Sequence, residues 1–234
     1  MATDTDRGFV ELFEDFIGWD IIADKPEFAV DTDPVIEVVA TAPNGVVRVT
    51  MDAGQSNIGG ILFGQLQWDI TNGVRVEARV KLSAIGAADE RVGVWLTDLQ
   101  EDTLSEYPFT ATTTALTAAA NPDDAVGIFW EGNGGSGNWF AAGQNTDVIT
   151  ANGIANQTYK PKPVAGAYNT LCFDIAPGGL VADFYVDGKL ILNYKSATTP
   201  VCADVPLILV FGVTEGTTAI DADLDYIGAK SQRQ

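Results

Sequence analysis

The amino-acid sequence predicts an all-β protein whose fold is an antiparallel two-sheet β-sandwich. Apolar and polar residues alternate with the period of two that half-buried strands show, almost from end to end of the 234-residue chain. The 24 glycines and 10 prolines fit the many turns that such a fold needs. A chain of this length can bury a substantial core, so we expect one sandwich domain over 9–230, an N-terminal arm over 1–8 and a tail over 231–234.

The first half of the chain contains the clearest strand. Residues 74–82 place five apolar side chains on one face and four charged ones on the other, which indicates a half-buried strand. Weaker strand patterns precede it in residues 9–16, 46–51 and 59–63. Residues 115–120 resemble a helix but lack an apolar face, so we expect them to form part of a long loop.

Three later strands, in residues 92–96, 126–130 and 207–211, are apolar on both faces. Such a strand needs cover on both sides. The sandwich core can supply one cover. For the other we expect loops, with a partner subunit as the alternative.

The C-terminal part of the chain contains a β-hairpin signal. A strand in residues 171–175 ends at the turn-forming residues 176–179. A second strand in residues 181–186 then reaches Asp187-Gly188, a hairpin-turn dipeptide, and residues 190–192 return from it.

The charge balance excludes some classes of partner. The chain has 32 acidic and 13 basic residues, a net charge of −19 and no histidine. Such a surface repels phosphate, so we expect neither nucleic acid nor an anionic membrane as a partner. The lack of histidine removes the commonest general base and the commonest transition-metal ligand.

The cysteines and the N-terminus bear on the compartment. We expect Cys172 and Cys202 to be free thiols, with a disulfide between them as the alternative, because no secretory context is visible. The polar, acidic N-terminus does not resemble a signal peptide, and no apolar run approaches the ~20 residues that span a bilayer. We therefore expect a soluble protein that is made in a cytoplasm.

Several segments resemble concanavalin-like and laminin-G-like jelly rolls. Residues 168–175, followed by 184–190 with the sequence Phe-Tyr-Val-Asp-Gly-Lys-Leu, are similar to their aromatic-led strand and the strand that closes on a hairpin. Residues 224–227 resemble the strand that ends many such sandwiches, and residues 13–16 resemble the first one. The resemblance implies a concanavalin-like jelly roll in which the first and last strands pair.

The termini resemble, more narrowly, a group of tailed-bacteriophage virion proteins. The matching residues are Phe13, Asp15 and Phe16, then Asp225-Tyr226-Ile227 and Gln232-Arg233. The resemblance implies a structural protein that decorates or cements the capsid exterior and is made in the host bacterial cytoplasm. It also implies contacts with the major capsid protein or another virion protein, and a homo-oligomer such as a trimer.

Asp221, Asp223 and Asp225 form the most specific chemical pattern. Residues two apart on a strand share a face at about 6.6–6.8 Å, which is in range for the paired carboxylates of glycoside hydrolysis. Laminarinase-like glucanases, which have the expected fold, use an acid-x-Asp-x-acid pattern in mid-chain with Glu at both ends, whereas here all three acids are Asp on the last strand. We expect instead the solvent-facing side of that strand, with four residues facing the core: Ile220, Ala222, Leu224 and Tyr226.

Two other patterns are candidate binding sites. Asp31-Thr32-Asp33 and Asp123-Asp124 are rich in oxygen, but they lack the ligand spacing of a calcium loop, so we expect no metal. The glycine-rich residues 131–140 lack the ending of a phosphate loop. We expect a hairpin loop there, with an exposed tip on which Trp139 stacks against a sugar or partner as the alternative.

The sequence therefore favours a non-enzymatic virion structural protein, with no catalytic, cofactor-binding or metal residues. The chain contains neither a histidine base nor a Gly-x-Ser-x-Gly nucleophile motif. The alternative is a lectin-like carbohydrate-binding module that takes a glycan as its ligand. Trp68, Trp95 and Trp130 lie in apolar strands and are expected in the core. A glycan hydrolase that uses Asp221, Asp223 and Asp225 is the third hypothesis.

Overall fold

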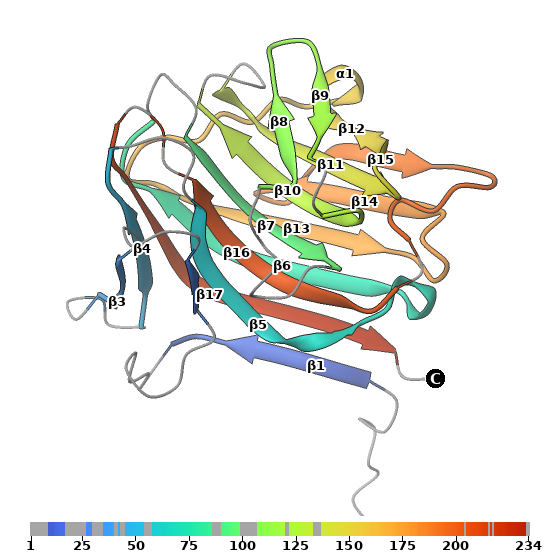
Figure 1. The fold of residues 1–234 in the computed structure, drawn as a ribbon, viewed down its shortest axis with the longest axis horizontal. Coiled ribbons are helices and arrows are strands. Elements are labelled where there is room, and N and C mark those ends of the chain that lie inside the picture. The colour runs from blue at the N-terminus through green and yellow to red at the C-terminus, as the bar shows by residue number, and fades with distance from the viewer. Residues whose placement is uncertain are drawn as a thin grey trace, which may run out of the picture.

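The computed structural model confirms the all-β sandwich. It describes residues 9–16, 27–29, 35–39, 42, 45–53, 58–85, 90–98, 107–119, 122–132, 137–203, 205–214, 216 and 218–232. Within these ranges almost every regular element is a strand, and all the strand pairs are antiparallel (Figure 1). The helical segments described are single turns, α1 (Gly153–Asn156) and η1 (Ile70–Asn72), and none could cross a membrane.

Two large sheets contain most of the described strands. Sheet A has the order β15 (Lys189–Lys195), β14 (Val181–Val186), β13 (Tyr168–Ile175), β6 (Val74–Leu82), β17 (Ile220–Gln232), β4 (Val47–Met51) and β3 (Val35–Val38), with β1 (Phe9–Glu14) also paired to β17. Sheet B has the order β12 (Val148–Asn152), β11 (Trp139–Asn145), β10 (Ala125–Glu131), β7 (Arg91–Thr97), β16 (Leu207–Thr214), β5 (Ile58–Trp68) and β2 (Glu27–Ala29). A small hairpin joins β8 (Phe109–Ala111) and β9 (Leu116–Ala118).

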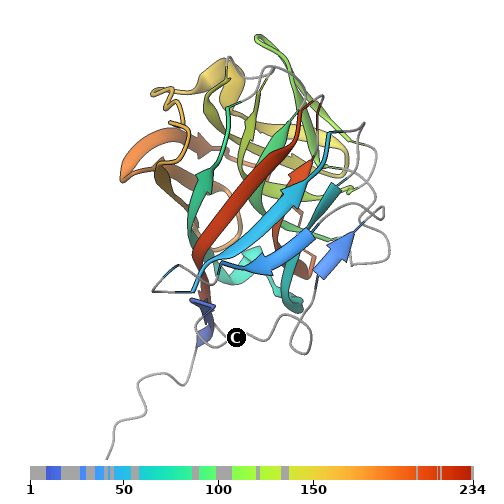
Figure 2. The ribbon, with the colours of Figure 1, turned by 90° about the vertical axis from the view of Figure 1, so that its left-hand side faces the viewer.

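The last strand, β17, lies beside three other strands of sheet A. Its first half pairs with β4, its second half pairs with β1, and both halves pair with β6 (Figure 2). The expected pairing of the first and last strands is confirmed, since Phe9 lies opposite Gln232 and Glu14 opposite Ile227. The strand also runs two residues into the segment that we predicted as a tail, and the predicted arm over 1–8 lies outside the described residues.

A β-bulge interrupts β17 between Leu224 and Tyr226. Before the bulge, apolar residues at even positions face the core, and after it Ile227 and Ala229 do. A bulge inserts one extra residue and therefore moves the following side chains to the opposite face. The prediction that Tyr226 faces the core is wrong for this reason, because its side chain lies on the outer face of sheet A.

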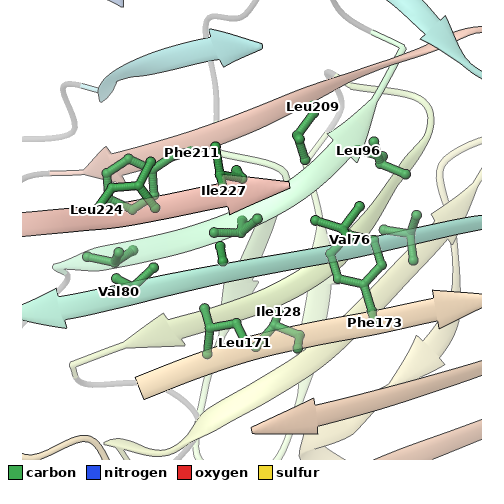
Figure 3. Packing of buried hydrophobic residues seen from close by; sticks show 14 of the residues in the cluster. Val76, Val80, Leu96, Ile128, Leu171, Phe173, Leu209, Phe211, Leu224 and Ile227 are labelled. Atoms are coloured by element: carbon green, nitrogen blue, oxygen red, sulfur yellow. The ribbon is translucent and has the colours of Figure 1, made fainter. Parts of the chain in front are cut away.

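The main core fills the space between the sheets. Figure 3 shows side chains from strands of both sheets meeting there, among them Val76 of β6, Phe173 of β13 and Phe211 of β16. All three are buried. Burial of a side chain of this size contributes about 1.5–3 kcal/mol, so this layer is the main source of stability.

The β8–β9 hairpin lies over the other face of sheet B (Figure 1), and a second apolar cluster forms where the two pack together. Tyr107 packs against Trp95 with ring centroids 5.1 Å apart, and Phe109 packs against Phe129 at 4.8 Å. The prediction that a loop segment covers the strands that are apolar on both faces is therefore confirmed. Within residues 115–120, however, Leu116–Ala118 form the short strand β9, where we expected only loop.

Two paired glycines give the aromatic rings room against sheet B. Gly93 and Gly212 lie opposite each other on β7 and β16. A Cβ atom at Gly212 would lie 2.2 Å from the Trp95 ring, and one at Gly93 would lie 2.5 Å from the Tyr107 hydroxyl. Only glycine leaves enough space at these positions.

The turn and cysteine predictions are confirmed. Asp187 and Gly188 both have positive φ, 50° and 73°, as the tight hairpin between β14 and β15 requires. Cys172 and Cys202 are free and buried. Burial raises the pKa of both thiols, that of Cys202 well above its usual value.

Candidate functional site

The outer face of sheet A carries the aspartates that the sequence singled out. Asp223 lies directly opposite Arg48 on β4 and Lys81 on β6. Its side chain is only 2 % exposed, and its carboxylate accepts hydrogen bonds from Arg48 Nε at 2.6 Å and Arg48 Nη2 at 3.0 Å. Lys81 Nζ lies 2.6 Å from Oδ2, the same oxygen that accepts from Arg48 Nη2.

The two flanking aspartates are also engaged. Asp225 lies 2.5 Å from Arg79 Nη1, and Asp221 accepts a hydrogen bond from Thr50 Oγ1 at 2.9 Å. The ring of Tyr168 lies over this network, with the Arg79 guanidinium carbon 4.4 Å from its centroid. The three acids thus belong to a charged network with neighbouring strands.

The electrostatics of Asp223 fit a structural role. Burial by itself would raise its pKa, but the hydrogen bonds and charges of Arg48 and Lys81 outweigh burial and hold the pKa below its usual value. A general acid in glycoside hydrolysis needs the opposite shift. The geometry therefore gives no support to a catalytic carboxylate pair on β17.

A groove lies on the same face, between β1, β17 and β6. It has a volume of about 250 Å³ and is lined by Glu11, Leu12, Phe13, Arg75, Glu77, Tyr226, Gly228, Ala229 and Lys230. We call it the Phe13 groove. Phe13 is 65 % exposed, and its ring stacks on that of Tyr226 with centroids 6.0 Å apart and planes 29° apart.

Charged groups surround this aromatic pair. The Tyr226 hydroxyl donates a hydrogen bond to Glu77 Oε1 at 2.9 Å, and Arg75 Nη2 lies 3.6 Å from the same carboxylate. Lys230 Nζ lies 3.7 Å from Glu11. A neighbouring hollow of about 210 Å³ shares Arg75 and Lys230 with the groove, so the depression continues past the aromatic pair toward the β13–β14 turn.

Local sequence explains why the groove forms. The bulge in β17 turns Tyr226 outward, and the pairing of β1 with β17 places Phe13 beside it, opposite Gly228. A Cβ atom at position 228 would lie 3.3 Å from the Phe13 ring, so glycine leaves room for it. The sequence pattern identified Phe13 and Tyr226 as parts of strands but not as a site. A signal was present, because adjacent Tyr226 and Ile227 break the alternation of the last strand.

Trp139 and Asp124, which the sequence also singled out, are both buried. Trp139 is fully buried and donates a hydrogen bond from Nε1 to Asn169 Oδ1 at 3.0 Å, so the alternative of a Trp139 contact tip is wrong. Asp124 accepts hydrogen bonds from the backbone N–H groups of Thr146 and Ala203. Asp31-Thr32-Asp33 lies outside the described residues.

The described residues show no metal centre and no exposed tryptophan platform. Where the structure describes the chain, no group of three or more Cys, Asp or Glu side chains is placed to hold a metal ion. Trp68, Trp95 and Trp130 are fully buried, which confirms that they belong to the core.

Comparison with solved structures establishes the fold class. A protein of unknown function from Shewanella oneidensis MR-1 matches with a TM-score of 0.61 and 15% identity over 96% of this chain and 87% of its own. Peanut lectin matches with a TM-score of 0.57 and 11% identity over 97% of this chain and 99% of its own. A prokaryotic β-1,3-1,4-glucanase (lichenase) from a mouse hindgut metagenome matches with a TM-score of 0.55 and 11% identity over 94% of this chain and 98% of its own.

The protein therefore has the concanavalin-like jelly-roll fold that its sequence predicted. Neither the family models nor the curated proteins include a match to this sequence. At these identities the likeness shows the fold alone, and the virion role inferred from the termini stays a prediction.

The similar structures correct one expectation. We predicted that the chain is not an enzyme, and this is contradicted because several structures of the same fold are enzymes. They include the lichenase and a native glycosidic hydrolase, the latter with a TM-score of 0.54 and 17% identity over 94% of this chain and 95% of its own. The absence of histidine and of a nucleophile motif was a poor guide, because glycoside hydrolysis needs only carboxyl groups.

Proposed function

We propose that this protein binds carbohydrate and that the Phe13 groove is the binding site. The observation that carries the proposal is the exposed Phe13 ring, stacked on Tyr226 at the surface and bordered by charged side chains. Covering a large exposed aromatic ring removes apolar surface from water and so lowers the free energy. The apolar C–H face of a sugar ring is such a cover.

The charged residues of the groove are suited to bind the hydroxyl groups of a sugar. A hydroxyl group both donates and accepts hydrogen bonds. Glu77 and Glu11 can accept from hydroxyl groups, while Arg75 and Lys230 can donate to them. A few polar groups around an apolar surface are the usual composition of a small-molecule site. The shared fold with a lectin and a glucanase supports the same class of ligand.

A glycan array followed by calorimetry tests the proposal. The purified protein is applied to an array of plant, bacterial and animal glycans, and the best-bound oligosaccharide is titrated into the solution. We expect Phe13→Ala to weaken binding by at least about tenfold, which corresponds to about 1.4 kcal/mol.

Val148→Ala is the matched control. Val148 is 63 % exposed, close to the value for Phe13, but it lies on β12 of sheet B. Binding should be unchanged in this variant. If the array stays silent, or if Phe13→Ala binds as well as the unaltered protein, the groove is not a carbohydrate site.

A further inference from the structure

The charge of this protein is distributed unevenly over the structure. Two segments, residues 157–167 and β15, hold four of the 13 basic residues and none of the 32 acidic ones. The four are Lys160, Lys162, Lys189 and Lys195. The rest of the chain is therefore even more acidic than the net charge of −19 indicates.

The structure brings three of these lysines to one edge of sheet A. β15 is the edge strand (Figure 1), and Thr158 donates a hydrogen bond from its backbone N–H to the Ile191 carbonyl at 2.8 Å. Three residues further on, the Pro161 carbonyl accepts from the backbone N–H of Trp139 at 2.8 Å. The first anchor ties the segment to β15, and the second ties it to Trp139 on β11 of sheet B. Trp139 donates to Asn169, whose amide donates to Asp187 just before β15, so both anchors lie near the start of that strand.

Aromatic and aliphatic surface accompanies the charge. Lys189 Nζ lies 4.9 Å from the centroid of the Tyr159 ring. Tyr159 is 41 % exposed and Leu190 is 38 % exposed. We call Tyr159, Lys160, Lys162, Lys189 and Leu190 the lysine patch. The acidic residue next in sequence, Asp187, accepts hydrogen bonds from Asn169 and Thr170 and is thereby held toward β13.

Protection of the sheet edge explains only part of this arrangement. Lysines on an edge strand discourage pairing with another sheet, which accounts for Lys189 and Lys195. Lys160 and Lys162 lie outside the strand, in a segment with prolines at 161 and 163. Their exposed side chains add positive charge beyond that of the edge strand itself.

We infer that the lysine patch binds an anionic polysaccharide. The acidic remainder of the surface repels a polyanion, so the patch is where such a chain can approach. The ammonium groups pair with carboxylate or sulfate groups along the chain, and the Tyr159 ring offers a face for a sugar ring. This inference rests on the proposed function in that the ligand is a carbohydrate, but it uses a different surface.

Retention on immobilised polysaccharides tests the inference. The full chain is applied to polygalacturonate, which carries carboxylates, to dextran sulfate, and to neutral dextran. We expect binding to at least one of the charged polymers and none to dextran, with affinity that falls as NaCl rises because salt screens exposed charges. Whichever polymer binds identifies the carboxylate or the sulfate as the recognised group.

Lysine variants locate the surface. Lys160→Gln combined with Lys162→Gln should weaken binding at least about tenfold, and either substitution alone should have a smaller effect. Lys195→Gln removes the same charge as one of these single variants, from the far end of β15, and should bind normally. Absence of binding to both charged polymers would overturn the inference. So would a loss of affinity in Lys195→Gln as large as that in Lys160→Gln or Lys162→Gln alone.

The Phe13→Ala variant separates this inference from the proposed function. It should bind the charged polymer normally, because Phe13 lies on β1, across sheet A from β15. If no glycan on the array bound but the charged polymer still did, the Phe13 groove would be refuted as a carbohydrate site, and the lysine patch inference would stand. If Phe13→Ala lost polymer binding, the polymer would occupy the groove and the patch inference would fail.

Discussion

At the residue scale, Asp223 shows how a sheet can bury a charge. Its neighbours on both adjacent strands are cations, because the register places Arg48 and Lys81 directly opposite. A buried carboxylate loses the solvation of water, and only close, hydrogen-bonded partners offset that loss. Asp223 has both, so its charge is tolerated at a position that is almost inaccessible to solvent.

The substitution Asp223→Asn should therefore destabilise the fold. The amide nearly keeps the shape of the carboxylate but leaves Arg48 and Lys81 without a counter-charge, so we expect a loss of about 2–3 kcal/mol in the free energy of unfolding at pH 7. Urea denaturation measures it. Asp221→Asn is the control, because the Asp221 side chain is 34% exposed, and its loss should stay below about 1 kcal/mol. Equal losses in the two variants would contradict this account.

The same residue predicts how stability depends on pH. The pKa of Asp223 is lower in the folded protein than its usual value, so the folded state favours the ionised form. Its contribution to stability is complete above the unfolded pKa of about 3.9 and is lost as the pH falls through the lower folded pKa. In Asp223→Asn, the acid-induced fall in unfolding free energy should be shallower below about pH 4. Parallel curves for the two proteins would show that Asp223 does not titrate in this way.

At the element scale, the β8–β9 hairpin acts as a cover for sheet B. Phe109 of β8 is fully buried where the hairpin packs on sheet B, so Phe109→Ala should lower the free energy of unfolding by about 3–5 kcal/mol. Tyr107→Phe is the informative comparison. The Tyr107 hydroxyl is buried and has no hydrogen-bond partner among the described residues, so its removal should leave stability unchanged or raise it by up to about 1 kcal/mol. Thermal or urea unfolding distinguishes these results, and a large loss in Tyr107→Phe would reveal a partner.

The strands themselves were predictable where one rule governs burial. Val74–Leu82 alternates without interruption, and the structure buries its five apolar side chains as expected. The last strand was harder, because the bulge at Leu224/Tyr226 changes which face each residue occupies. Alternation alone cannot place a side chain beyond such a break.

The candidate site was less predictable than the fold. The Phe13 groove requires three strands that are distant in sequence. The pairing of β1 with β17 was expected from the family resemblance, but no local pattern reports that β6 lies on the other side of β17. The charges opposite Asp223 offered a partial clue. Lys81 lies on the solvent-facing side of a predicted strand and could have been matched with an acidic strand, but the register that joins them is a tertiary property.

At the scale of the whole molecule, the net charge of −19 works against the compact state. Like charges on the surface repel one another more strongly when folded, and salt screens this repulsion. We expect the midpoint of thermal unfolding to rise between about 10 and 500 mM NaCl. The close ion pairs around Asp223 are partly buried and are screened less. A midpoint that stays constant or falls would mean that favourable charge pairs outweigh the general repulsion.

The glycine pair of sheet B limits how this sequence can change over evolutionary time. A methyl group gained at Gly212 must be matched by atoms lost from Trp95, and one gained at Gly93 by atoms lost from Tyr107 and Phe129. Descendants of this chain can therefore exchange these residues only in compensated steps, and the two glycines should persist wherever these rings do.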